Sequence, residues 1–175
     1  LYTEWDMAIS EAVVLIGHGG VPSDFPREQV SELKGLEHAR EREGRQDMCE
    51  REAELDRLVR TWPRTDDSDP YKSGLEAVGR ALALRLGERR LEIAYNEFCA
   101  PSPDEVIDRL VADGVKEIRL LTTMFTRGGS HSEKDIPDLV ERACKRHSGV
   151  SIDYSWPYNL ELVADLLAGQ LKLGD

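Results

Sequence analysis

Two histidines and one glutamate are the side chains of this sequence best suited to bind a metal ion or to move protons. His18 stands within the glycine-rich segment 17–20, Glu97 follows the apolar run 91–95, and His131 follows two glycines and a serine. Imidazole and carboxylate groups bind divalent metals such as Fe²⁺, Co²⁺, Ni²⁺ and Zn²⁺, and the same groups act as general bases. A single histidine in a loop is usually only hydrogen-bonded, so the hypothesis requires a fold that brings all three together.

Four short apolar segments predict the strands that would bring these groups together. Each is rich in β-branched or aliphatic residues and has the length of a buried strand; they span residues 12–17, 91–95, 117–122 and, more weakly, 150–154. His18 and Glu97 closely follow the first two strands, and His131 lies in the loop after the third. The carboxyl ends of parallel strands meet at one edge of a sheet, where such folds bind their ligands. We therefore expect both imidazoles and the carboxylate at that edge.

Helical patterns alternate with these strands. They cover residues 73–86, 103–113, 135–147 and 159–171, with apolar residues spaced along one helix face. Ser102 is expected to cap the second helix and Asp135 the third. The alternation predicts an α/β fold, a doubly wound parallel sheet of at least four strands, of flavodoxin-like or related type.

The connection between the first and second strands is much longer than a crossover helix requires. Within it, residues 38–60 carry mostly charged side chains over a thin apolar stripe, and Gly44 interrupts the pattern. This predicts one or two solvent-exposed helices. We therefore expect a single domain over residues 1–175 with a helical insertion at about 21–72. Met7 is a candidate natural start, with residues 1–6 as an extension.

The composition and the remaining motifs exclude several classes of protein. The 34 acidic residues exceed the 23 basic ones and give a net charge of −11, which argues against a nucleic-acid partner. No apolar run approaches the roughly 18 residues of a transmembrane helix, so no membrane partner is expected. Cys49, Cys99 and Cys144 form no C-x-x-C pair, which predicts no disulfide framework and favours the cytoplasm. The dinucleotide-binding pattern G-x-G-x-x-G is also missing after the first strand.

Three segments of the sequence resemble those of one known family. VVLIGHG at residues 13–19, EFCAP at 97–101 and GGSHSEKDIP at 128–137 resemble the class II tetrapyrrole chelatases, the sirohydrochlorin chelatase family. The spacing His-x-x-x-Asp-Ile-Pro in the third segment is the most specific feature. The resemblance extends over residues 10–20 and 75–171, and it implies a chelatase-like α/β fold of the kind that the periodicity predicts.

This resemblance implies a lyase that inserts Co²⁺, Fe²⁺ or Ni²⁺ into sirohydrochlorin or a related tetrapyrrole, on the routes to cobalamin or siroheme. It implies that His18, His131 and Glu97 are metal ligands and also the catalytic groups that accept the pyrrole protons. The divalent metal is then a substrate, and no organic cofactor is expected. The residues expected to bind the carboxylate-rich tetrapyrrole are Gly19, Gly20, Arg127, Gly128, Gly129 and Ser130, together with the helix start at 135–137.

Two alternatives remain open at this level. A tetrapyrrole is broad and flat, and this chain holds one copy of each motif, so we expect a homodimer in which a second subunit supplies the opposite wall. The insertion could instead fold over the site as a lid.

The sequence departs from the family at Gly20 and Val21, where Ser-Arg is common, and at Thr123. The alternative function is therefore a non-catalytic metallochaperone or tetrapyrrole carrier.

Overall fold

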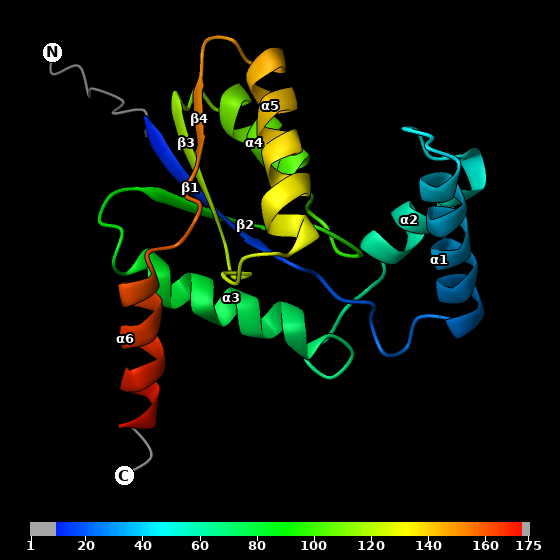
Figure 1. Ribbon diagram of the computed structural model, residues 1–175, viewed down its shortest axis with the longest axis horizontal. Coiled ribbons are helices and arrows are strands. Elements are labelled where there is room, and N and C mark those ends of the chain that lie inside the picture. Colours follow the sequence, from blue (N-terminus) through cyan, green and yellow to red (C-terminus); the bar gives the residue numbers. More distant parts are fainter. Residues whose placement is uncertain (1–9, 173–175) are drawn as a thin grey trace, which may run out of the picture.

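A four-stranded parallel sheet forms the centre of the protein. The computed structural model describes residues 10–172; residues 1–9, which include the candidate start Met7, and residues 173–175 lie outside the described part. The strands are β1 (Glu11–Gly17), β2 (Arg90–Tyr95), β3 (Glu117–Thr122) and β4 (Ser151–Tyr154), in the order β2-β1-β3-β4 (Figure 1). This is the order of a doubly wound sheet of flavodoxin-like type, so the predicted fold class is confirmed.

Six α-helices accompany the sheet within residues 10–172. They are α1 (Arg27–Arg42), α2 (Glu50–Arg60), α3 (Pro70–Ala83), α4 (Pro103–Ala112), α5 (Ile136–Arg146) and α6 (Leu160–Leu171). Helices α4 and α5 pack on one face of the sheet and α3 on the other (Figure 1). Helix α3 begins before the predicted residue 73, because the Asp69 side chain accepts the N–H of Lys72 and Pro70 occupies the first turn.

Strand β1 is buried on both faces, as expected for the strand that lies between β2 and β3. Ile16 belongs to the apolar core beneath α4 and α5, whereas Leu15 packs with Leu75 of α3 on the opposite face. The register pairs Gly17 with Tyr95 and Ile16 with Thr122. Strands β1, β2 and β3 therefore end level with one another, and the loops that follow them start from the same edge of the sheet.

The long connection after β1 forms two helices, α1 and α2, which stand beside the sheet (Figure 1). Gly44 lies between them with a positive φ of 64°, so the predicted break at this glycine is confirmed. The prediction of two largely exposed helices with a thin apolar stripe is confirmed, but the stripe is packed. Leu33, Leu55 and Val59 are buried in an apolar cluster of their own, and this cluster includes Phe98 from the loop after β2. The insertion is thus packed against a loop of the sheet edge.

Neither a membrane-spanning helix nor a disulfide bond occurs in the described residues. No helix between residues 10 and 172 has both the length and the apolar character needed to cross a bilayer. Cys49, Cys99 and Cys144 are free thiols, and Cys99 is buried.

Limited digestion with trypsin is expected to cut first after Arg42 or Arg45. Residues 41–48 are exposed throughout and join the two insertion helices, so they adapt to a protease more easily than the packed helices do. The segment 64–69 should resist, because the Arg64 side chain is only 6% exposed and pairs with Asp69. Mass spectrometry of the first fragments checks the order. First cleavage after Arg64 would contradict the packing described for the insertion.

Candidate functional site

The structure brings His18, Glu97 and His131 together at the carboxyl edge of the sheet. One ligand atom from each residue lies within 4.8 Å of the others, and all three side chains are half-buried. The two imidazole rings lie nearly perpendicular with centroids 4.8 Å apart, and Nε2 of His131 lies 3.2 Å from Oε1 of Glu97. In the described part of the chain, this is the one group of three such side chains close enough to share a metal ion.

Backbone hydrogen bonds join the loop that carries His18 to the loop that carries Glu97. The N–H of Asn96 donates to the carbonyl of Gly17 at 2.9 Å, and the N–H of Glu97 donates to the carbonyl of His18 at 2.8 Å. Gly19 has a φ of +93°, and a Cβ atom there would lie 1.8 Å from the carbonyl oxygen of Glu97. Only glycine allows this close approach of the two loops.

His131 is oriented through its Nδ1 atom. Oδ2 of Asp135 lies 2.6 Å from this nitrogen, and the Asn96 amide lies 2.9 Å from it. An ionised carboxylate only accepts hydrogen bonds, so Nδ1–H of His131 donates to Oδ2 of Asp135. Nε2 is then the nitrogen that can bind a metal ion, and it lies 3.2 Å from Oε1 of Glu97. Carboxylate partners of this kind fix the tautomer of metal-binding histidines.

The predicted capping role of Asp135 is wrong. A π-helical turn over His131–Asp135 runs directly into α5, and Asp135 has helical backbone angles and caps nothing. The turn aligns the side chains of His131 and Asp135 on one side of the helix. The N–H of Ile136 bonds the carbonyl of His131, so residues 135–137 offer no open helix N-terminus for a carboxylate.

His18 is held in an equivalent tautomer by its own loop. Its Nδ1 lies 2.8 Å from the carbonyl oxygen of Gly19, which accepts the Nδ1–H and leaves the Nε2 lone pair free. Its backbone N–H donates to the hydroxyl of Tyr71 in α3 at 2.7 Å. In this tautomer, Nε2 is the nitrogen of each histidine that can bind a metal ion. Sequence reasoning missed Tyr71, Asn96 and the role of Asp135; only the His131–Asp135 spacing could have indicated the last.

A model of the CbiX family matches residues 66–171, which is more than half of the chain. The chain belongs to the CbiX family. This confirms the resemblance to the class II chelatases, whose motifs at His131 and Glu97 lie within the matched segment.

A curated relative of this CbiX-family chain supports the family match. A protein named sirohydrochlorin cobaltochelatase, from Methanococcus aeolicus, is 30% identical over 83 residues, which are 45% of this chain and 55% of that protein. The match thus spans about half the length of the curated relative.

Two solved structures have a similar fold. One, described as a cobalamin (vitamin B12) biosynthesis CbiX protein from Marinobacter aquaeolei VT8, superposes with a TM-score of 0.53 at 18% identity, over 94% of this chain and 97% of that one. SirB from Bacillus subtilis with Fe³⁺ has a TM-score of 0.50 at 16% identity, over 95% of this chain and 48% of that one. At this identity both support the fold alone.

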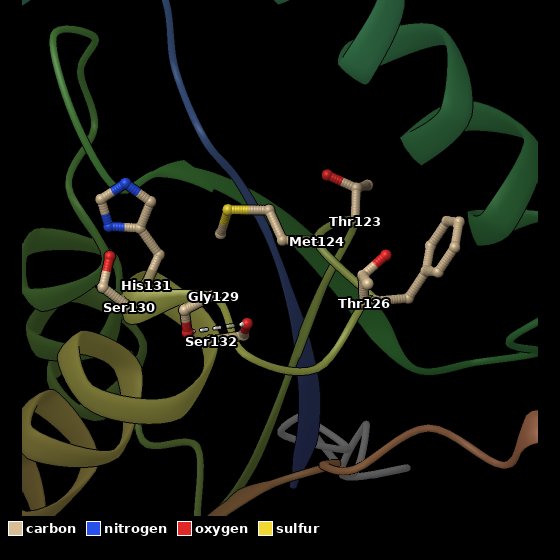
Figure 2. A pocket seen from close by; sticks show the side chains of 8 residues that line it. Thr123, Met124, Thr126, Gly129, Ser130, His131 and Ser132 are labelled. Carbon is tan, nitrogen blue, oxygen red and sulfur yellow. Dashed lines mark hydrogen bonds between the residues drawn. The ribbon is translucent and has the colours of Figure 1, made fainter.

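A cavity of about 330 Å³ lies against His131 in this CbiX-family protein (Figure 2). Figure 2 shows the Met124 side chain extending toward His131, with Ser130 and Gly129 on the side of the histidine. The remaining lining residues are Thr123, Phe125, Thr126 and Ser132. Of the residues predicted to bind substrate, Gly129 and Ser130 line this cavity. Met124 was missed because an isolated methionine after a strand has no sequence signature.

The other predicted substrate-binding residues lie around the site without lining this cavity. The Arg127 side chain is 73% exposed, and its Nε atom lies 3.4 Å from Glu133. Gly128 occupies a turn with a φ of +88°. Gly19 contacts the Glu97 loop as described, and a Cβ at Gly20 would meet its nearest atom, Oδ1 of Asp69, at 3.8 Å. Arg127 is therefore free to reorient toward a ligand, whereas the glycines shape the backbone.

A larger groove, of about 840 Å³, lies between the insertion and α5 on the other side of His131. Its floor includes Glu97 and His131, and one wall comes from α1, α2 and the segment that joins them, with Glu37, Arg40, Glu41, Arg45 and Arg60. Burial is the largest cause that raises the pKa of Glu37, and the negative charge of Glu97 raises it further. The insertion thus borders Glu97 and His131.

Proposed function

We propose that this chain is a metal chelatase that inserts Co²⁺, Fe²⁺ or Ni²⁺ into sirohydrochlorin or a related tetrapyrrole. The observation that carries the proposal is the group of two imidazole nitrogens, one from each histidine, and one carboxylate oxygen within 4.8 Å of each other. The family match and the cobaltochelatase name of the relative from Methanococcus aeolicus support the same reaction class. The metal is a substrate in this proposal, and the reaction requires no organic cofactor.

The proposed mechanism uses the free Nε2 atoms of His18 and His131. Metal insertion replaces two pyrrole N–H protons by one divalent cation, so two protons must leave the macrocycle. His18, His131 and Glu97 first present the cation, and as it transfers to the pyrrole nitrogens the same three groups become free to accept the protons. Asp135 accepts the Nδ1–H of His131 and stabilises the imidazolium that forms.

Substrate binding is proposed to use the loop after β3 and the groove beside the insertion. Gly129 and Ser130 line the smaller cavity next to His131, where their backbone can lie close to a flat macrocycle. Arg127, exposed and only loosely paired with Glu133, can bind a peripheral carboxylate. Gly19, Gly20 and Gly128 are proposed to shape the backbone of the loops that surround the bound macrocycle. We also propose that residues 1–175 form one domain with an insertion at about 21–72, since Phe98, from the loop after β2, is buried in the apolar cluster of the insertion.

An anaerobic absorbance assay tests the proposed function. Sirohydrochlorin in excess over protein is mixed with Co²⁺, Fe²⁺ or Ni²⁺ in turn, and the spectrum of the macrocycle is followed. Conversion of many equivalents per chain, above the rate without protein, supports the chelatase and identifies the metal. A spectral shift that stops at one equivalent per chain would instead support the metallochaperone or tetrapyrrole carrier, which requires the same ligands.

The chain is expected to form a homodimer through α6. This helix has no buried residue, and its exposed leucines are Leu160, Leu162, Leu166, Leu167 and Leu171. Burying such a surface contributes about 25 cal/mol per Å². Light scattering should give about twice the chain mass of 19.7 kDa, and the double variant Leu162→Glu/Leu166→Glu should give the single mass. Leu84→Glu, at a leucine that is 87% exposed on α3's C-terminal side, is the control. A monomeric wild type would contradict the dimer.

A further inference from the structure

Arg64, in the segment between α2 and α3, is almost fully buried beside the proposed metal ligands. Its side chain is 6% exposed and pairs with the carboxylate of Asp69, which is 3% exposed. Its guanidinium also donates to three backbone carbonyls, those of Gly20 at 2.8 Å, Val59 at 2.9 Å and Phe98. A planar guanidinium holds several acceptors in a fixed geometry, which a lysine ammonium does not.

Two of the three carbonyls that Arg64 binds belong to the two loops that carry proposed metal ligands, and the third, that of Val59, belongs to α2. Gly20 is in the loop of His18, and Phe98 directly follows Glu97. Phe98 has a φ of +55°, which is uncommon for a residue other than glycine and needs support from its surroundings. That support comes from the insertion, since the Phe98 ring is buried in the apolar cluster of α1 and α2.

Arg60, at the end of α2, holds the same loop from a second direction. Its guanidinium donates to the carbonyls of Asn96 and Cys99, each at 3.2 Å, and pairs with Asp56. The N–H of Ala100 donates in return to the backbone carbonyl of Arg60 at 3.1 Å. Arg60 and Arg64 together therefore bind backbone carbonyls before and after Glu97.

We propose that Arg64, assisted by Arg60, is a positioning residue that sets the separation of His18 and Glu97, so that the insertion is required for metal binding. The proposal rests on the ligand roles assigned under the proposed function. Arg64 touches neither the metal nor the macrocycle. Its effect passes through the carbonyls of Gly20 and Phe98, which fix how far apart the two ligand loops lie. Loss of the guanidinium lets these loops separate and removes the shared site for the cation.

Titration of the protein with Co²⁺ alone, followed by the visible absorption of the ion, tests this inference. Arg64→Lys keeps the positive charge beside Asp69 but cannot bind all three carbonyls, and it is expected to raise the Kd for Co²⁺ by a factor of about 10 to 100. Arg60→Lys should raise the Kd for Co²⁺ by a smaller factor. This variant provides the test if Arg64→Lys does not fold. Arg57→Lys, on the exposed side of α2, should leave Co²⁺ binding unchanged.

Two further variants separate positioning from a general loss of stability and from an error in the ligand assignment. Leu110→Ala removes a buried side chain of α4 from the core on the sheet face that α4 and α5 cover, a cluster that includes neither ligand loop, and it is expected to lower the melting temperature. If Leu110→Ala weakens Co²⁺ binding as much as Arg64→Lys does at an equal loss of melting temperature, the positioning role is wrong. If His131→Ala abolishes binding while both arginine variants bind Co²⁺ like the wild type, the inference alone fails. If His131→Ala binds normally, the ligand assignment fails and the inference with it.

Discussion

The His131→Ala variant is expected to lose metal insertion by a factor of about 100 or more while it keeps its fold. Residue 131 supplies one of the two free Nε2 atoms, and it lies between the cavity of the β3 loop and the groove beside the insertion. Its removal takes away a ligand and a proton acceptor in one step. The imidazole is half-buried and contributes little to the apolar core, so the melting temperature should change little.

His38→Ala is the matched control for this experiment. His38 lies exposed on α1 and lines neither the cavity nor the groove, so its removal deletes an imidazole without touching the site. The rate of insertion is measured anaerobically with each variant, and circular dichroism checks the fold. Near-normal turnover by His131→Ala would show that the proposed centre does not perform the reaction.

The Gly19→Ala variant is expected to weaken Co²⁺ binding by about tenfold or more and to destabilise the protein by ~1–3 kcal/mol. The added Cβ would lie 1.8 Å from the carbonyl oxygen of Glu97, and the φ of +93° is unfavourable for alanine. The two loops must then move apart, and this displaces His18 from Glu97.

Gly20→Ala provides a closely matched comparison. The nearest atom to its added Cβ, Oδ1 of Asp69, lies at 3.8 Å, which is an ordinary contact. Urea unfolding and Co²⁺ titration should therefore separate two neighbouring glycines, with a large effect at residue 19 and a small one at residue 20. Equal effects of the two substitutions would mean that the close approach of the loops is not needed for metal binding.

Much of the framework of this site can be predicted from the sequence. The predicted strands agree with β1, β2, β3 and β4 to within one residue at each end, because apolar runs of only about four to eight residues that are rich in β-branched and aliphatic side chains favour a buried strand over a helix. The three metal-binding candidates follow from that arrangement, since parallel strands that end in register place their following loops at one edge. Ser102 caps α4 as predicted, because a cap depends on neighbouring residues only.

The supporting residues of the site depend on contacts between distant segments, and the local sequence does not encode them. Arg64 stands among ordinary polar residues of a turn-rich segment, and only its burial against the carbonyls of Gly20 and Phe98 reveals its role. The insertion has the composition of a solvated helix pair, yet its few apolar residues enclose Phe98.

The sequence by itself therefore determined the sheet and its loops and singled out His18, Glu97 and His131 as candidate metal ligands, because periodicity and strand order depend on local patterns and chain direction. Only the tertiary structure decided that Asp135 orients His131 instead of capping α5, that Gly19 must lack a side chain, and that the insertion borders the ligand groove. Each of these features depends on which distant residue a polar or apolar group contacts. Those contacts form only when the chain folds, because folding brings segments that are far apart in the sequence together.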